Sequence, residues 1–339
     1  MAKFKSRCLL VGVGISAILT ACGKSDVYFP SDVPDVSVEI VRFDSALLSV
    51  RTDSLAHDVR NLYAAYPEFM PLFVEGVLDI PASDTAFLCT QLSAFLTDTV
   101  FGFAQTNQLV RTRFADIRPI RSELQSGFSR IHYLYPNLPI PTVYLFVSGF
   151  NSSLFSYSDW IAVGVDMYLG SDYPDYTRVV YEYQKQTMRP ECIATDVLSL
   201  YVAQNIPFTS RSNRLLEQMI YRGKQMWLLS RLLPDQPDYE IMGYTPAQWQ
   251  WCERYERDIW NHIMDRRDLF RTESAVLSSY INDGPFTAEV SQESPGRLGT
   301  WVGWRIVESY MRHNSSVSIQ QLMANGNAQQ ILEQSYYKP

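Results

Sequence analysis

Histidine and cysteine are scarce in this chain of 339 residues, which contains four of the first and five of the second. The histidines are His57, His132, His262 and His313, and no two lie three or four residues apart. A zinc site on a helix, such as HExxH, needs two imidazoles one turn apart. The sequence also lacks GxSxG, GxGxxG and P-loop motifs. We therefore predict no catalytic residue, no metal site and no cofactor.

Basic residues are also few, since 29 Lys and Arg face 36 Asp and Glu, a net charge of −7. This balance argues against nucleic acid as a partner. Apolar residues make up 46% and charged residues 19% of the chain, which is typical of a folded globular protein. The aromatic share is 13%. We expect these rings mostly in a core.

The amino terminus has the pattern of an export signal. Lys3, Lys5 and Arg7 precede an apolar run from Cys8 to Ala21, which is too short for a confident transmembrane helix. The run ends in Leu-Thr-Ala-Cys at 19–22 and resembles a bacterial lipobox. We predict cleavage of a signal peptide at 1–21, acylation of Cys22 and an exposed lipidated stalk at 22–35. The alternatives are an uncleaved anchor or a plain signal with a chance cysteine.

Cleavage would change both the charge and the cysteine content. The mature chain would have 26 basic and 36 acidic residues, a net charge of −10. Its remaining cysteines, Cys89, Cys192 and Cys252, form no CxxC pair. They imply no disulfide framework, and buried free thiols are favoured over one bridge with one free thiol.

Hydrophobic spacing predicts a small sheet among many helices. Strands are expected near 36–43, 142–148 and 160–165, with a loop at 149–153. Helices are expected within 44–113, at 120–135 and through most of the chain after Gly170. Helix starts are predicted at Pro190, Thr245-Pro246, Ser294-Pro295, Ser318 and Asn327. The fold class is therefore α+β, with one mostly helical domain at 36–339.

Three glycines and the seven tryptophans can each be interpreted in two ways. Gly296, Gly299 and Gly303 are spaced to share a helix face, which suits either tight core packing or a helix flooring a central site. The seven tryptophans suit a core better than a sugar-stacking surface, because Trp249 and Trp260 fall on one face of the same helix.

Several segments together resemble the gliding-motility lipoprotein GldB family of Bacteroidetes. They are VEIVRFD at 38–44, IAVGVDMYLGSDYPDY at 161–176, MRPE at 188–191, GYTPAQWQWC at 243–252, ESPGRLGTWVGWRIVESYM at 293–311 and the closing SYYKP. The resemblance implies a lipid-anchored cell-envelope protein, facing the periplasm, that assists gliding motility and type IX secretion. It also implies protein partners in that machinery.

The family is distantly similar to zincin metallopeptidases, which implies a zincin-like scaffold. In this chain the two histidine positions of HExxH would be Pro190 and Ala194, and only the glutamate position, Glu191, remains. We therefore expect a non-enzymatic protein that binds a protein partner through a degenerate peptidase-like cleft. The cleft would lie between the helix after Pro190 and the helix at 295–313. The polar residues expected to line it are Arg42, Asp44, Glu191, Asp196, Glu293 and Arg297.

Two other functions remain open. One is a metal-dependent or other hydrolase that uses Glu191 as general base. The other is a glycan-binding lipoprotein, which would need solvent-exposed, coplanar aromatic rings.

Overall fold

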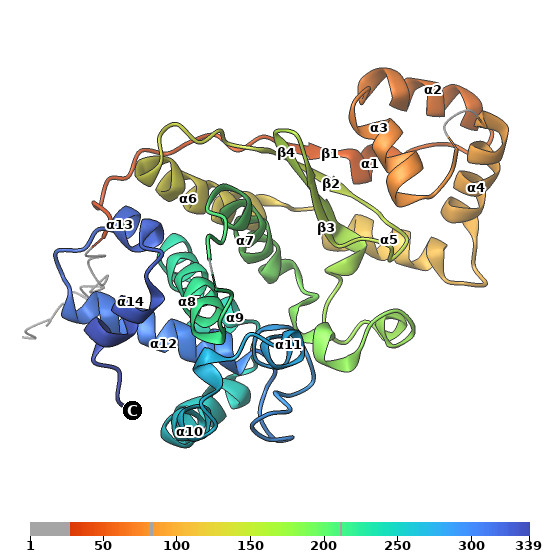
Figure 1. The fold of residues 1–339 in the computed structure, drawn as a ribbon. Helices are drawn as coiled ribbons and strands as arrows, with labels where there is room; N and C mark the ends of the chain where they lie inside the picture. Colours follow the sequence, from red (N-terminus) through yellow and green to blue (C-terminus); the bar gives the residue numbers. More distant parts are fainter. Residues whose placement is uncertain (1–27, 82–83, 211) are drawn as a thin grey trace, which may run out of the picture.

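A computed structural model describes residues 28–81, 84–210 and 212–339. The expected signal peptide and Cys22 lie outside these residues. A four-stranded mixed sheet separates a first group of helices, within residues 43–113, from a larger group, within residues 215–335 (Figure 1). The chain is thus mostly helical around a small sheet, and the predicted α+β class is confirmed.

The sheet has the strand order β1-β2-β4-β3, formed by Ile40–Arg42, Thr142–Phe146, Trp160–Gly164 and Leu154–Tyr157. β1, β2 and β4 are parallel, and β3 is an antiparallel edge strand. All five residues of β4 are buried, as expected for a strand covered on both faces. The sequence predicted three of these strands but not β3, because LFSY is short and lacks a clear alternation.

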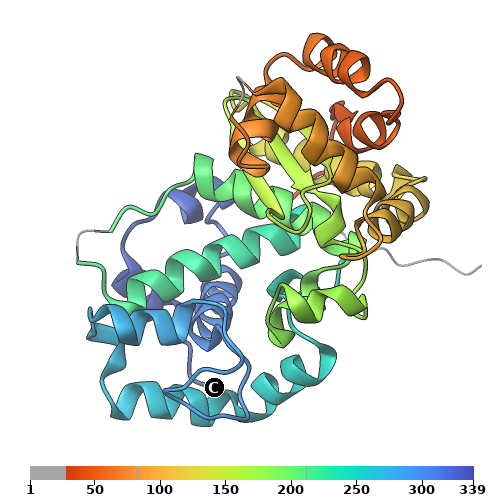
Figure 2. The ribbon, with the colours of Figure 1, turned by 90° about the vertical axis from the view of Figure 1, so that its right-hand side faces the viewer.

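The first helices pack against the sheet through aromatic rings. α1 (Phe43–Leu48), α2 (Leu55–Ala65), α3 (Phe69–Leu72), the π-helical turn Phe73–Val77, α4 (Thr85–Thr97) and α5 (Phe103–Arg113) form this group, which lies at one end of the molecule in both views (Figures 1 and 2). Phe69 stacks on Tyr144 of β2, with ring centroids 4.6 Å apart, and also contacts Phe43 and Trp160. The aromatic residues of this region therefore belong to the core.

The remaining helices form the larger group and the connection to it. They are α6 (Arg118–Leu134), α7 (Ile193–Asn205), α8 (Leu215–Leu232), α9 (Asp238–Met242), α10 (Pro246–Asp265), α11 (Ser274–Ile281), α12 (Leu298–His313), α13 (Ile319–Ala324) and α14 (Ala328–Ser335). α8 and α12 make the most extensive helix pair of the described chain. In the described residues, no helix has the length and apolar character needed to cross a membrane.

Gly299 and Gly303 of α12 and Gly223 of α8 allow close packing between helices. A Cβ on Gly303 of α12 would lie 1.8 Å from the Met219 carbonyl oxygen of α8, and one on Gly223 of α8 would lie 2.2 Å from the Gly303 carbonyl carbon. A Cβ on Gly299 would meet Tyr280 of α11 at 2.9 Å. Bare backbone at these positions therefore sets the distance between α12 and its neighbours.

The predicted start of this last helix at Ser294-Pro295 is wrong. α12 begins at Leu298, because Arg297 has φ 62°, a left-handed conformation that an α-helix does not propagate. Gly296 therefore precedes the helix and does not share its face with Gly299 and Gly303.

Other local predictions are confirmed. Thr245 and Ser318 each accept a hydrogen bond from the backbone N–H three residues on, within capping boxes, and Asn327 caps α14 in the same way. Four of the seven tryptophans are buried and the other three pack half-buried against the core. Cys192 and Cys252 are buried free thiols, and Cys89 is a half-buried one.

The described end of the expected stalk is packed against the domain. Phe29 is buried, with the Arg130 guanidinium 4.9 Å from its ring centroid, and Tyr28 makes an edge contact with Trp227 of α8. The expected exposure of 22–35 therefore does not hold at these two residues, since their rings gain more from apolar burial than from water.

Candidate functional site

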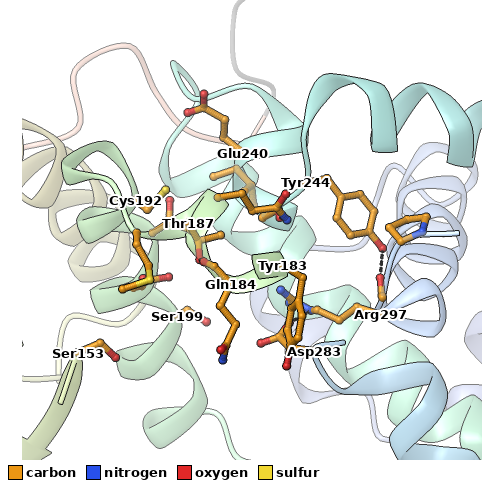
Figure 3. A pocket seen from close by; sticks show the side chains of 18 of the residues that line it. Ser153, Tyr183, Gln184, Thr187, Cys192, Ser199, Glu240, Tyr244, Asp283 and Arg297 are labelled. Atoms are coloured by element: carbon orange, nitrogen blue, oxygen red, sulfur yellow. Dashed lines mark hydrogen bonds and ion pairs between the residues drawn. The ribbon is translucent and has the colours of Figure 1, made fainter. Parts of the chain in front are cut away.

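A polar pocket lies where the segment between β4 and α7 meets α7, α9 and the residues before α12. It encloses about 290 Å³. In Figure 3, Ser153, Cys192 and Ser199 lie on one side of it, Tyr244, Asp283 and Arg297 lie on the other, and the side chain of Gln184 lies between them. Side chains from five separate stretches of the sequence therefore meet in one cavity.

The segment between β4 and α7 is held in shape by buried hydrogen bonds. It contains short 3₁₀ turns at Val165–Met167, Pro174–Arg178, Glu182–Thr187 and Pro190–Cys192. Asp166 is buried and accepts hydrogen bonds from the Ser148 and Phe150 backbone N–H groups, each at 2.8 Å. The Tyr176 hydroxyl donates to the Asp166 carbonyl oxygen at 2.8 Å and accepts from the Leu169 N–H. These bonds fix the wall of the pocket that Tyr168 and Gln184 provide.

Asp196 of α7 is the enclosed carboxylate of the pocket. Its Oδ2 accepts a hydrogen bond from the Tyr168 hydroxyl at 2.8 Å. Burial raises the pKa of this carboxyl to about 6, while the Tyr168 bond and the charge of Arg297 lower it and Asp283 raises it. No cation among the described residues lies within ion-pair distance of Asp196. Because its pKa is about 6, the carboxyl is ionised at neutral pH. Its charge is then not paired with a cation of the described residues.

Arg297 is positioned by its left-handed backbone at the start of α12. Its Nη1 donates to the Met242 carbonyl oxygen at 3.2 Å, and its Nε lies 3.3 Å from an Asp283 carboxylate oxygen. Asp283 is 67% exposed. The guanidinium is therefore oriented from one side by the end of α9 and neutralised from the other by an exposed carboxylate.

The upper rim of the pocket contains Glu240 and Tyr244. Glu240 lies 3.6 Å from the Arg189 guanidinium. The buried Tyr244 hydroxyl donates to the Gly296 carbonyl oxygen at 2.5 Å, which ties the loop before α10 to the loop before α12 (Figure 3). Burial raises the pKa of the Cys192 thiol to about 12, so this thiol is protonated and weakly nucleophilic at neutral pH.

The six residues expected to line a cleft do not meet in one place. Asp196 and Arg297 line the pocket. Arg42 and Asp44 form a bidentate ion pair, at 2.8 and 2.7 Å, where β1 joins α1, and do not line it. Glu191 is 55% exposed and lies 4.0 Å from Arg189, and Glu293 is exposed; neither lines the pocket.

Sequence reasoning missed Tyr168, Glu240, Tyr244 and Asp283. Tyr168 and Tyr244 lie within the segments at 161–176 and 243–252, which resemble the GldB family. That resemblance could have pointed to these two residues as candidates for the site. Glu240 and Asp283 gave no local signal, because their arginine partners come from distant segments. Within the described ranges, no three His, Cys, Asp or Glu side chains are grouped so as to hold a metal ion.

The comparison with known proteins found one matching family. Residues 29–339 match the family model described as gliding motility protein GldB. No curated protein matches the chain, and no solved structure matches it. The comparisons thus give no support to the expected zincin scaffold. Because the match extends over nearly all of the described residues, the chain belongs to the family of gliding motility protein GldB.

Proposed function

We propose that this protein is a non-enzymatic, lipid-anchored accessory of the gliding and type IX secretion machinery that faces the periplasm. It would act by binding a protein partner through the pocket around Asp196. The observation that supports this most is the unpaired Asp196 carboxylate in a cavity of about 290 Å³ built by a continuous family-matched domain. Such a concave site with a few convergent polar groups is a typical binding site.

The placement of Glu191 supports a non-enzymatic role. A hydrolase would need its general base beside bound substrate. Glu191 instead lies outside the pocket and contacts Arg189. The Cys192 thiol, which lines the same pocket as Asp196, is protonated at neutral pH and is therefore a weak nucleophile.

Filling the pocket tests the binding proposal. Ser199→Trp places an indole at a position that lines the pocket, whereas Ser278→Trp makes the same change at an exposed position of α11 outside it. We expect immunoprecipitation after crosslinking in cells to lose specific partners with Ser199→Trp and to retain them with Ser278→Trp. Equal partner sets for the two stable variants would reject the proposal.

Elemental analysis tests the absence of metal chemistry. We expect the purified full-length protein to contain far less than one zinc per chain after dialysis. Stoichiometric zinc that is lost in Glu191→Gln would instead favour the hydrolase alternative.

Glycan binding remains a second candidate because of one observation beside the pocket. Tyr181 is 72% exposed, and its ring is nearly parallel to that of Tyr183, which lines the pocket. A glycan array with wild type and Tyr181→Ala would support this candidate if a specific signal were lost in the variant. We expect no such signal.

A further inference from the structure

We infer that the pocket receives one basic side chain, arginine or lysine, from an extended segment of the partner protein, and that Asp196 is its counter-charge. This inference rests on the proposed function, because it names the part of the partner that enters the same pocket.

The charges of the pocket leave one carboxylate unpaired. Its charged lining residues are Asp196, Glu240, Asp283 and Arg297. Arg297 pairs with Asp283 at 3.3 Å, and Glu240 pairs with Arg189 at 3.6 Å. Asp196 keeps its negative charge inside the cavity. A cationic guest would neutralise it, whereas an acidic guest would add a second negative charge.

One oxygen of Asp196 is available to a guest. Oδ2 holds the Tyr168 hydroxyl, and Oδ1 has no hydrogen-bond partner among the described residues. Asp196 lines the pocket, and Oδ1 is the oxygen of its carboxylate that Tyr168 does not occupy. A carboxylate accepts several hydrogen bonds, and a guanidinium or ammonium donates the charge-assisted kind.

The walls suit the aliphatic part of a long basic side chain. Met167, Met188, Met226, Leu229 and Ile241 line the pocket together with Asp196. Thioether and aliphatic groups pack well against the methylene stem of lysine or arginine, whose charged end then reaches the carboxylate. A short polar guest would leave these apolar walls uncovered.

The size of the cavity favours one side chain over a folded element. Its volume of 290 Å³ lies at the lower end of ligand pockets, which span roughly 300–1,000 Å³. A helix is about 10 Å wide with its side chains and does not fit. An extended segment that inserts one residue does.

Binding should follow the ionisation of Asp196. The titratable and charged groups around this carboxyl are Tyr168, Cys192, Asp283 and Arg297. Burial raises the pKa of the Tyr168 hydroxyl and of the Cys192 thiol, so neither ionises below neutral pH. The Asp283 side chain is exposed to solvent. Between pH 5 and pH 7.5 the ionised fraction of a carboxyl with pKa about 6 rises about tenfold. Affinity for a cation should rise by the same factor.

The test uses the full-length chain in detergent micelles and ligand-observed saturation-transfer NMR. The probes are Nα-acetyl-arginine methylamide, its neutral isostere Nα-acetyl-citrulline methylamide, and Nα-acetyl-glutamate methylamide. We expect the arginine probe to bind at least tenfold more tightly than the other two, and its affinity to rise about tenfold from pH 5 to pH 7.5. Asp196→Asn should abolish this preference and its pH dependence, and Asp53→Asn, at an exposed position outside the pocket, should change neither.

Equal binding of the arginine and citrulline probes would overturn the inference, as would a preference for the glutamate probe or an unchanged preference in Asp196→Asn. The fold of each variant is checked by its thermal transition. If the probes fail while Ser199→Trp still removes crosslinked partners, only the basic guest is wrong. If Ser199→Trp removes none, the proposed function itself is wrong.

Discussion

Asp196 is expected to reduce the stability of the folded protein. Burial raises its pKa from 3.8 to about 6, so the folded state binds a proton more tightly than the unfolded state. The protonated carboxyl does not destabilise the folded state. As pH rises from about 4 to 6, the cost of ionising the buried carboxyl lowers the free energy of unfolding. Two pKa units correspond to roughly 2–3 kcal/mol.

We therefore expect Asp196→Asn to have a free energy of unfolding up to roughly 2–3 kcal/mol higher than that of wild type at pH 7.5, and so to unfold at a higher urea concentration. At pH 4 we expect the two proteins to have the same stability. Asp53→Asn should leave stability unchanged at both pH values. A lower stability of Asp196→Asn at pH 7.5 would show that the carboxylate is a structural partner of its surroundings and not a vacant binding group.

The sequence predicted only some of the residues that line the pocket. Asp196 and Arg297 were expected to line a cleft, and both line the pocket. Arg42 and Asp44 were expected there too, but their side chains pair with each other instead. Glu293 stands on an exposed turn. A pocket needs side chains from distant segments, and the sequence does not show which of them meet.

At the scale of elements, the contact of α8 with α12 depends on the absence of side chains. A Cβ on Gly303 would lie 1.8 Å from the Met219 carbonyl oxygen, a rigid backbone atom. A Cβ on Gly299 would meet Tyr280 at 2.9 Å, and one on Gly76 would meet nothing within 4 Å. The three glycines therefore form a graded series for one substitution.

We expect Gly303→Ala to lower the free energy of unfolding by more than about 2 kcal/mol, because overpacking must separate the two helices. Gly299→Ala should cost less, and Gly76→Ala should be neutral or stabilising, because alanine favours helical backbone over glycine. Urea denaturation of the three variants gives the ranking. A loss for Gly76→Ala as large as that for Gly303→Ala would mean that backbone propensity, and not packing, sets these costs.

Elements with strong local patterns were predictable. The parallel strands β2 and β4 are β-branched and apolar, and α10, α13 and α14 begin at recognisable caps. β3 and the start of α12 were not predictable in this way. β3 forms because it pairs with β4, and α12 begins late because of the left-handed backbone at Arg297, and neither cause is local to the residue pattern.

For the whole molecule, the expected anchor at Cys22 and the packed residues Tyr28 and Phe29 would together limit the distance between the domain and the membrane. Tyr28 and Phe29 contact the domain. Only five residues of the sequence lie between Cys22 and Tyr28. An extended chain spans at most about 3.6 Å per residue, so the domain would stay within roughly 20 Å of the bilayer. We expect Cys22→Ser to move the protein from the membrane fraction to the soluble fraction with its thermal transition unchanged. Retention of the variant in membranes would contradict acylation at this position.

We propose that this domain binds a protein partner in the pocket around Asp196, so the bound partner should lie within reach of residues that line the pocket. The most direct test places a photocrosslinking amino acid at Gln184, which lines the pocket, in the full-length protein in its own cells. We expect a discrete protein adduct on illumination, which is lost when Ser199→Trp fills the pocket and is absent with the crosslinker at Ser278. An absent adduct at Gln184, or one unchanged by Ser199→Trp, would show that no protein partner binds in this pocket.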